Sequence, residues 1–324
     1  MENLSLAHPS PCKFWPRVFA LFFDSIILCV AGLLLGLAFH DDFAKMGVYG
    51  RLVGFGLSLG YFGILNSSIG GGQTLGKKAC DIIVVRKDGK RIGLLSSLTR
   101  STILLAPFFA NGLPIAPSKL ATFWGIALTI LVFGFGFCIV YLYIANRRTR
   151  QSLHDLVIGS FVVFRNEEIK AEDNQKLNRL HFFVCGTFVV IILVFALFVG
   201  PSIAKKDTYV PLLETQKEIW SLDFVSYCQI GDSTTYSPSG KYTQFVVFAV
   251  VKKKENTGSE YIKRIIRSVF DNYPKVEDRD YLRITLSYGY DIGIAHTFSS
   301  QSRVDTIPHW KNAVYNEPSE SDSN

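Results

Sequence analysis

The sequence predicts an all-α, multi-pass bundle of membrane helices with a small cytoplasmic β-hairpin, followed by a small α+β extramembrane domain. The chain has 324 residues, and 48% of them are hydrophobic, which favours the membrane class. Several apolar runs are long enough to cross a bilayer. Residues 1–200 carry 19 Lys and Arg against 11 Asp and Glu, whereas residues 201–324 carry 15 against 16. This distribution is typical of basic cytoplasmic loops, and no nucleic-acid partner is expected.

The first predicted span covers residues 16–39. Pro16 suits the first turn of a helix, and the run that follows contains only two charges, Arg17 and Asp24. These residues are seven apart, so they lie near one helical face, with Asp24 roughly 10 Å deeper than Arg17. A carboxylate at that depth normally faces protein or a water-filled cavity, which makes Asp24 a candidate functional residue. An ion pair that only orients one helix in the bundle is the alternative.

Three more full-length spans are predicted over residues 48–65, 121–145 and 181–200. A shorter apolar segment, 102–116, contains two prolines. Because the basic segments on both sides of the pair formed by 102–116 and 121–145 are expected in the cytoplasm, the short segment must cross as a kinked helix. A re-entrant or interfacial segment is the alternative. Five crossings place the N-terminus in the cytoplasm and the C-terminal domain on the external or periplasmic side of the cell inner membrane.

The cytoplasmic segment after the second span predicts a β-hairpin over residues 81–93. Asp88-Gly89 supplies the positive φ of a tight two-residue turn between β-branched residues. We expect this hairpin to pack on a nearby element, and the apolar run Phe161–Phe164 is the candidate partner.

The rest of the chain is predicted as a charged cytoplasmic linker (166–180), the last span, an external α+β domain (201–316) and a disordered tail (317–324). Within the external domain, strands are expected over 243–251 and 281–290, with an amphipathic helix over 259–272 between them. Further strands are considered over 222–230 and 292–298.

Three motifs occur in order among the first four hydrophobic segments. They are Arg17-x-x-Ala20-x-x-x-Asp24, then Thr74-Leu75-Gly76-Lys77 ahead of Ile83-x-Val85, and Arg150-x-x-x-His154-Asp155 ahead of Gly159. Together they resemble the RDD family of membrane proteins over about residues 13–165, which sets the membrane domain at 1–165. The family is named for one arginine and two aspartates, which correspond here to Arg17, Asp24 and Asp155. One departure is Leu75, where the family usually has proline, so the turn is expected to be looser.

The resemblance implies a compact bundle of membrane helices with a proposed transport role, including cation/proton exchange in some members. The predicted positions add geometry, because Arg17 and Asp155 stand at the same membrane surface and are natural ion-pair partners. Asp24 then lacks a close cation, and a buried carboxylate of that kind can take up a proton near neutrality, as a proton-coupled carrier requires. Lys77, Arg150 and His154 are supporting candidates, with His154 expected at the headgroup level as a surface group or as a pH-sensitive partner of Asp155.

Other chemistries find little support in the sequence. The pair His154-Asp155 alone cannot hold a catalytic metal, because no further ligands stand at suitable spacing. The six cysteines are scattered without a zinc or redox motif, and Gly70-Gly71-Gly72 does not open a P-loop. The basic residues from Lys77 to Arg91 could bind anionic lipid head groups, although a topological role explains them without further assumption. We therefore expect no enzyme activity, no cofactor and no metal.

The leading hypothesis is a transport-related membrane protein that uses an Arg-Asp-Asp network, with a proton, a small cation or another small solute as the transported species. The alternative is a membrane anchor or scaffold that presents an external domain for sensing or for binding a protein or ligand. A weaker option is an accessory protein for lipid modification or assembly. A polar cavity that reaches Asp24 would favour transport, whereas a dry bundle with all three charges mutually satisfied would favour an anchor.

Overall fold

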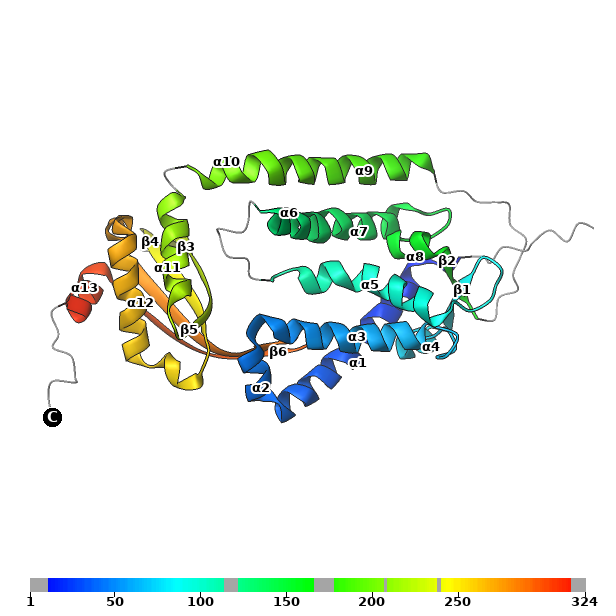
Figure 1. The fold of residues 1–324 in the computed structure, drawn as a ribbon, viewed down its shortest axis with the longest axis horizontal. Coiled ribbons are helices and arrows are strands. Elements are labelled where there is room, and N and C mark those ends of the chain that lie inside the picture. The colour runs from blue at the N-terminus through cyan, green and yellow to red at the C-terminus, as the bar shows by residue number, and fades with distance from the viewer. Residues whose placement is uncertain (1–10, 114–121, 166–177, 207–208, 238–239, 316–324) are drawn as a thin grey trace, which may run out of the picture.

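The computed structural model describes residues 11–113, 122–165, 178–206, 209–237 and 240–315. The predicted tail 317–324 and most of the linker 166–180 lie outside these residues. The described chain forms a helical bundle with a small two-stranded sheet at one end and an α+β domain at the other (Figure 1). The predicted fold class is thus confirmed.

Within the described residues, four helical stretches are long and apolar enough to cross a membrane: Phe14–Ala38, His40–Leu65, Phe123–Ala145 and Arg179–Ser202. The first is α1. The second comprises α2 (His40–Met46), η1 (Gly47–Tyr49) and α3 (Gly50–Leu65). The third joins α6 (Phe123–Thr129), the π-helical η3 (Ile130–Phe135) and α7 (Gly136–Ala145). The fourth runs through α9 (Arg179–Val194), the π-helical η4 (Phe195–Val199) and into α10 (Gly200–Ala204).

The short segment expected at 102–116 is part of a longer helix, α5, which covers Leu94–Ala110 and contains Pro107. The helix starts eight residues earlier than the expected position because its first two turns carry polar residues that face protein instead of water. Ser97, Arg100 and Ser101 are all buried there. With 17 residues, α5 is about 26 Å long, close to the thickness of a bilayer core. Residues 114–116 lie outside the described chain.

The two-stranded sheet pairs β1 (Ile82–Arg86) antiparallel with β2 (Ser160–Phe164), so the apolar run 161–164 is the partner of the hairpin segment. The Asp88-Gly89 turn forms, with Gly89 at φ 77° and a 2.7 Å hydrogen bond from Arg86 N to Lys90 O. The expected second arm is not a strand, because it contributes only the single bridge between Val85 and Arg91. The carbonyl oxygen of Gly72 occupies part of that edge by accepting from Val84 N.

The C-terminal domain has the four-stranded sheet order β3-β4-β5-β6. The strands are β3 (Val225–Ser237), β4 (Gly240–Val251), β5 (Tyr281–Asp291) and β6 (His296–Thr306). The helix predicted over 259–272 is α12 (Ser259–Asn272), and it makes the crossover between the parallel strands β4 and β5. Together with α11 (Val210–Ser221) and α13 (Ile307–Tyr315) it packs on the sheet around a core that includes Phe245, Ile265 and Leu286. Short 3-10 turns, η5 (Lys254–Thr257) and η6 (Pro274–Asp278), flank α12.

The turn between β5 and β6 inserts into the end of the bundle next to the C-terminal domain. Of the strand considered over 292–298, only the last three residues are strand, at the start of β6, whereas residues 292–295 form a tight connection closed by a 3.0 Å hydrogen bond from Ile292 N to Ala295 O. Ile292 and Ala295 are buried together with Phe43 of α2. At its base, Asp291 forms an ion pair with Arg51 of α3 at 2.7 Å. We call residues 291–295 the plug.

Candidate functional site

The end of the bundle next to the β1–β2 sheet holds a buried charge cluster centred on Asp155. The carboxylate lies on the short helix α8 (Leu153–Ile158), which Ser152 caps, and its Oδ2 accepts from Ser152 N at 3.3 Å. Gly159 ends the helix in the left-handed conformation and leads directly into β2. Ser160, the first residue of that strand, donates to Asp155 Oδ1 at 3.1 Å. A helix stop and a strand start therefore fix this acid in place.

Two arginines from two membrane helices meet at Asp155. Arg17 Nη2 of α1 lies 2.7 Å from Oδ2, and Arg100 Nη2 of α5 lies 2.7 Å from Oδ1. Arg17 Nη1 also donates to the carbonyl oxygen of Arg150. Burial alone would raise the pKa of the Asp155 carboxyl, but the Arg100 guanidinium, with His154 and Arg17, holds that pKa far below its ordinary value. Asp155 is therefore ionised at any physiological pH and ties α1, α5 and α8 together.

His154 differs from its expected position at the headgroup level. The side chain is only 3% exposed, and burial lowers its pKa to about 3, although Asp155 acts in the opposite direction. The imidazole is therefore neutral, with its Nε2 at 3.5 Å from Asp155 Oδ2. The expectation of a surface group or of a pH-sensitive partner is wrong, because α8 packs against α5 and α7 and removes the ring from water.

Asp24 lies deeper along α1 and is satisfied by neutral donors. Tyr61 Oη of α3 donates to Oδ1 at 2.6 Å, Thr74 Oγ1 donates to Oδ2 at 2.6 Å, and Gly76 N donates to Oδ1 at 2.8 Å. Thr74 caps α4 (Leu75–Ala79), a short helix that packs against α1. Three donors suit a carboxylate, which only accepts hydrogen bonds when ionised. As the sequence indicated, Asp24 forms no ion pair within the described chain.

The family departure at Leu75 has a specific role in this network. Its backbone N–H donates to Tyr61 Oη at 3.2 Å. The tyrosine hydroxyl therefore accepts from Leu75 and directs its own proton to Asp24. A proline at this position could not make the bond, because it has no N–H.

Lys77 is a buried cation without a bound acid among the described residues. Its ammonium group donates to Asn66 Oδ1, and the residue is 9% exposed. Burial, with the nearby Arg100, lowers the pKa of Lys77 to about 7 from an ordinary value of 10.5, while Asp24 and Asp155 act in the opposite direction. Arg17 also lowers this pKa. The group can therefore gain and lose a proton near neutrality.

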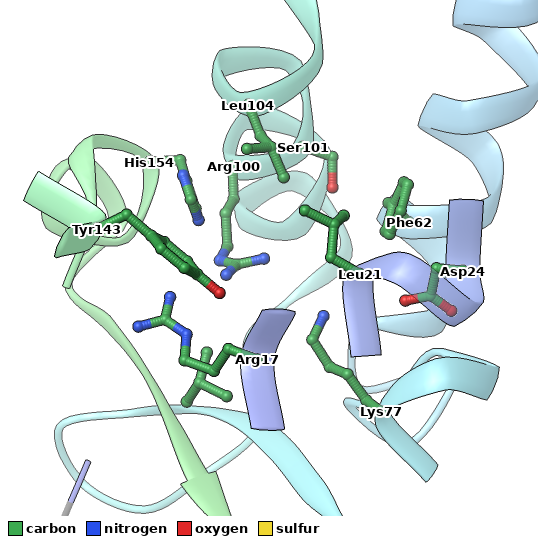
Figure 2. A pocket seen from close by; sticks show the side chains of 11 residues that line it. Arg17, Leu21, Asp24, Phe62, Lys77, Arg100, Ser101, Leu104, Tyr143 and His154 are labelled. Atoms are coloured by element: carbon green, nitrogen blue, oxygen red, sulfur yellow. The ribbon is translucent and has the colours of Figure 1, made fainter. Parts of the chain in front are cut away.

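A cavity of about 50 Å³ connects these groups. Figure 2 shows the guanidinium groups of Arg17 and Arg100 near Tyr143, and the amino group of Lys77 pointing toward Leu21. The other side chains that line it are Asp24, Phe62, Ser101, Leu104, His154 and Val162. By volume it holds roughly three or four water molecules. The cavity reaches Asp24, and Asp155 lies behind the two arginines instead of lining it.

The structure brings most of the predicted residues together. Arg17 and Asp155 form the expected ion pair, Asp24 and Lys77 line the cavity, and Arg150 contributes only its carbonyl oxygen. Sequence reasoning missed Arg100, Tyr61 and Thr74. Arg100 had no assigned role, because it precedes the apolar segment expected at 102–116 and is buried only where α5 packs against α8. Thr74 was quoted in a motif without a role, and Tyr61 carried no separate signal.

The fold and the site define an integral membrane protein with a polar cluster at one end of its helix bundle. Residues 11–159 match the model of the RDD family, and this part of the chain is an RDD family domain. An uncharacterised protein of Bacillus subtilis (strain 168), YckC, is 27% identical over 166 residues, which cover 50% of this chain and 93% of YckC. The C-terminal region lies outside the family match. No solved structure gives a significant match.

Proposed function

We propose that this protein is a transporter and not an enzyme, and that it couples the movement of a small solute across the membrane to a proton. The observation that carries the proposal is the cavity that Lys77 and Asp24 line together with two arginines. Ionisable groups inside a membrane protein are costly and commonly mark ion or proton pathways. A purely structural cluster would need neither the cavity nor a lysine without a bound acid.

Lys77 is the proton-carrying group in this proposal, in place of Asp24, which the sequence favoured. Asp24 already accepts three hydrogen bonds, whereas Lys77 has a pKa near 7 and a single amide partner. Asp24 then serves as the nearby acid that favours the protonated lysine. Loss or gain of the proton changes the net charge of the cavity by one unit, which is the requirement for coupling to a solute.

The test is proton flux into liposomes that contain the purified protein and an internal pH dye. An imposed solute gradient should drive proton movement with the wild-type protein. Lys77→Gln and Asp24→Asn should lose the flux while both variants keep a monodisperse elution profile. Lys78→Gln is the matched control, because Lys78 is the next residue on the same short helix and is exposed. Full flux in Lys77→Gln would refute its role as proton carrier.

A second candidate function, a membrane anchor for the C-terminal domain, has support from one feature. The plug packs into the bundle and Arg51 pairs with Asp291, so the two parts contact each other directly. Wild-type liposomes that pass neither protons nor solute under any imposed gradient would favour this alternative. We also propose the sidedness expected from the charge bias, with the β1–β2 end in the cytoplasm.

A further inference from the structure

The charges that face the cavity suit an anion. Asp155 lies behind Arg17 and Arg100 and offsets one of these two positive charges. The acid that does line the cavity, Asp24, has both oxygens occupied by donors. With Lys77 protonated, the cavity therefore has a net positive charge and spare N–H donors. A metal cation would meet repulsion there, because three basic side chains surround the same space.

Two further polar groups at the cavity are buried without a partner. Within the part of the chain that the structure describes, Ser101 Oγ and His154 Nδ1 have no hydrogen-bond partner. Both residues line the cavity and are at most 3% exposed. Leaving a buried polar group unpaired costs about 1–3 kcal/mol, so such groups are normally satisfied by a ligand or water. The Ser101 hydroxyl can donate to an oxyanion together with Lys77 and the arginines.

A second, apolar cavity begins where the polar one ends. It measures about 470 Å³ and lies between α1, α3 and α5. Leu21, Phe62 and Leu104 line both cavities, so a single layer of side chains separates them. The apolar cavity extends to Gly293 and Ile294 of the plug. The two spaces together form an elongated site with a basic inner end and a hydrophobic remainder.

The geometry points to an amphiphilic oxyanion as the ligand of this combined site: a molecule with a carboxylate or phosphate head in the polar cavity and an apolar chain in the larger one. This inference deepens the proposed function and rests on it for the identity of the transported solute. The head would contact Lys77, Arg17, Arg100 and Ser101. The chain would displace or pass the layer formed by Leu21, Phe62 and Leu104 and lie along α5.

The test measures binding in detergent solution with four probes, through the thermal unfolding midpoint of the full chain. Octanesulfonate carries a permanent negative head, octyltrimethylammonium carries the same tail with a positive head, and sodium sulfate and octanol supply head and tail alone. Because the two charged probes have the same octyl tail, partition of that tail into micelles affects both probes equally. We expect octanesulfonate to bind at least about tenfold more tightly than octyltrimethylammonium, as hydrogen bonds to a charged group would give.

Two variants locate the site. Lys77→Gln should reduce the preference for octanesulfonate over octyltrimethylammonium to within about threefold. The exposed neighbour variant Lys78→Gln should keep the full preference. Leu104→Trp, which fills the shared layer, should weaken octanesulfonate and leave any response to sulfate unchanged. Equal binding of the two charged amphiphiles, or a preference that survives Lys77→Gln, would overturn the inference. Sulfate binding as tight as octanesulfonate would overturn the role of the apolar cavity.

Binding and transport separate in this design. Head-selective binding without proton flux in liposomes would leave the ligand class standing and remove the proposed transport. Proton flux without selective binding would leave the proposed transport standing and remove the ligand class. Native phosphate-headed and carboxylate-headed lipids, added in nanodiscs of neutral lipid, then distinguish between the two natural head chemistries.

Discussion

At the scale of single residues, the two aspartates of the family motif have different surroundings. Asp155 pairs with arginines from two helices, so removing the acid would leave two buried guanidinium groups without their carboxylate. Asp24 is held by a tyrosine, a threonine and a backbone N–H, all neutral. Between them stands Lys77, the one described basic side chain at the cavity whose pKa lies near neutrality. Its proton therefore gives the site a dependence on pH near neutrality.

The stability of the protein should depend on pH through Lys77. Its folded pKa of about 7 lies below the ordinary value of 10.5, so in this window the unfolded chain binds a proton that the folded chain does not. The free energy of unfolding therefore rises with pH from 7 to 10.5, by at most about 1.4 kcal/mol per unit, and this contribution is constant below pH 7.

We expect the unfolding midpoint of the wild type, compared with Lys77→Met, to rise by roughly 2 °C per pH unit between pH 7 and 9. Lys78→Met should follow the wild type. The groups that face Lys77 are Arg17 and Asp24 of α1, Arg100 of α5 and Asp155 of α8. Parallel curves for the wild type and Lys77→Met would show that the ammonium group is solvated in both states.

At the scale of elements, glycines decide how the plug meets the bundle. A Cβ atom at Gly36 of α1 would overlap the hydroxyl of Tyr290, and one at Gly54 of α3 would overlap the carbonyl oxygen of Ile292. Gly32 and Gly50 also approach the plug closely. Glycine in the middle of a helix costs about 1 kcal/mol relative to alanine, so these positions favour close contact over helix stability.

Substitution of neighbouring glycines on α3 should have opposite effects. Gly54→Ala must displace the backbone of the plug, and overpacking of this kind destabilises by about 1–3 kcal/mol. Gly56 has open space around its Cβ position, so Gly56→Ala should stabilise by up to about 1 kcal/mol through helix propensity.

The unfolding midpoint and limited proteolysis of the β5–β6 turn measure the two effects. Gly54→Ala should lower the midpoint and expose the turn to cleavage, and Gly56→Ala should do neither. If Gly54→Ala is as stable and as resistant as Gly56→Ala, the plug does not pack against α3 in the membrane.

At the scale of the whole molecule, local pattern predicted the long apolar helices, the strand β1 and the amphipathic helix α12. Those features depend on runs and periods within one stretch of chain. The start of α5 and the role of Arg100 could not be predicted in this way, because their polar residues are buried only when α8 packs against them. The plug was likewise invisible, since residues 291–295 are a short turn whose burial depends on glycines some 240 positions earlier.

The number of crossings determines whether the two ends of the molecule face the same side. Four long helices alone would leave them on one side, whereas a fifth passage by α5 would separate them, and Figure 1 shows the β1–β2 sheet and the C-terminal domain at opposite ends of the bundle. Lys90, beside the turn after β1, and Gln301, in β6, are both exposed and report on the two ends. We expect a membrane-impermeant maleimide to label Gln301→Cys in intact cells, and Lys90→Cys only after the cells are opened, with the unmodified chain as the blank. Labelling of both in intact cells, or of neither, would mean an even number of crossings, and α5 would then have to lie in the membrane without passing through it.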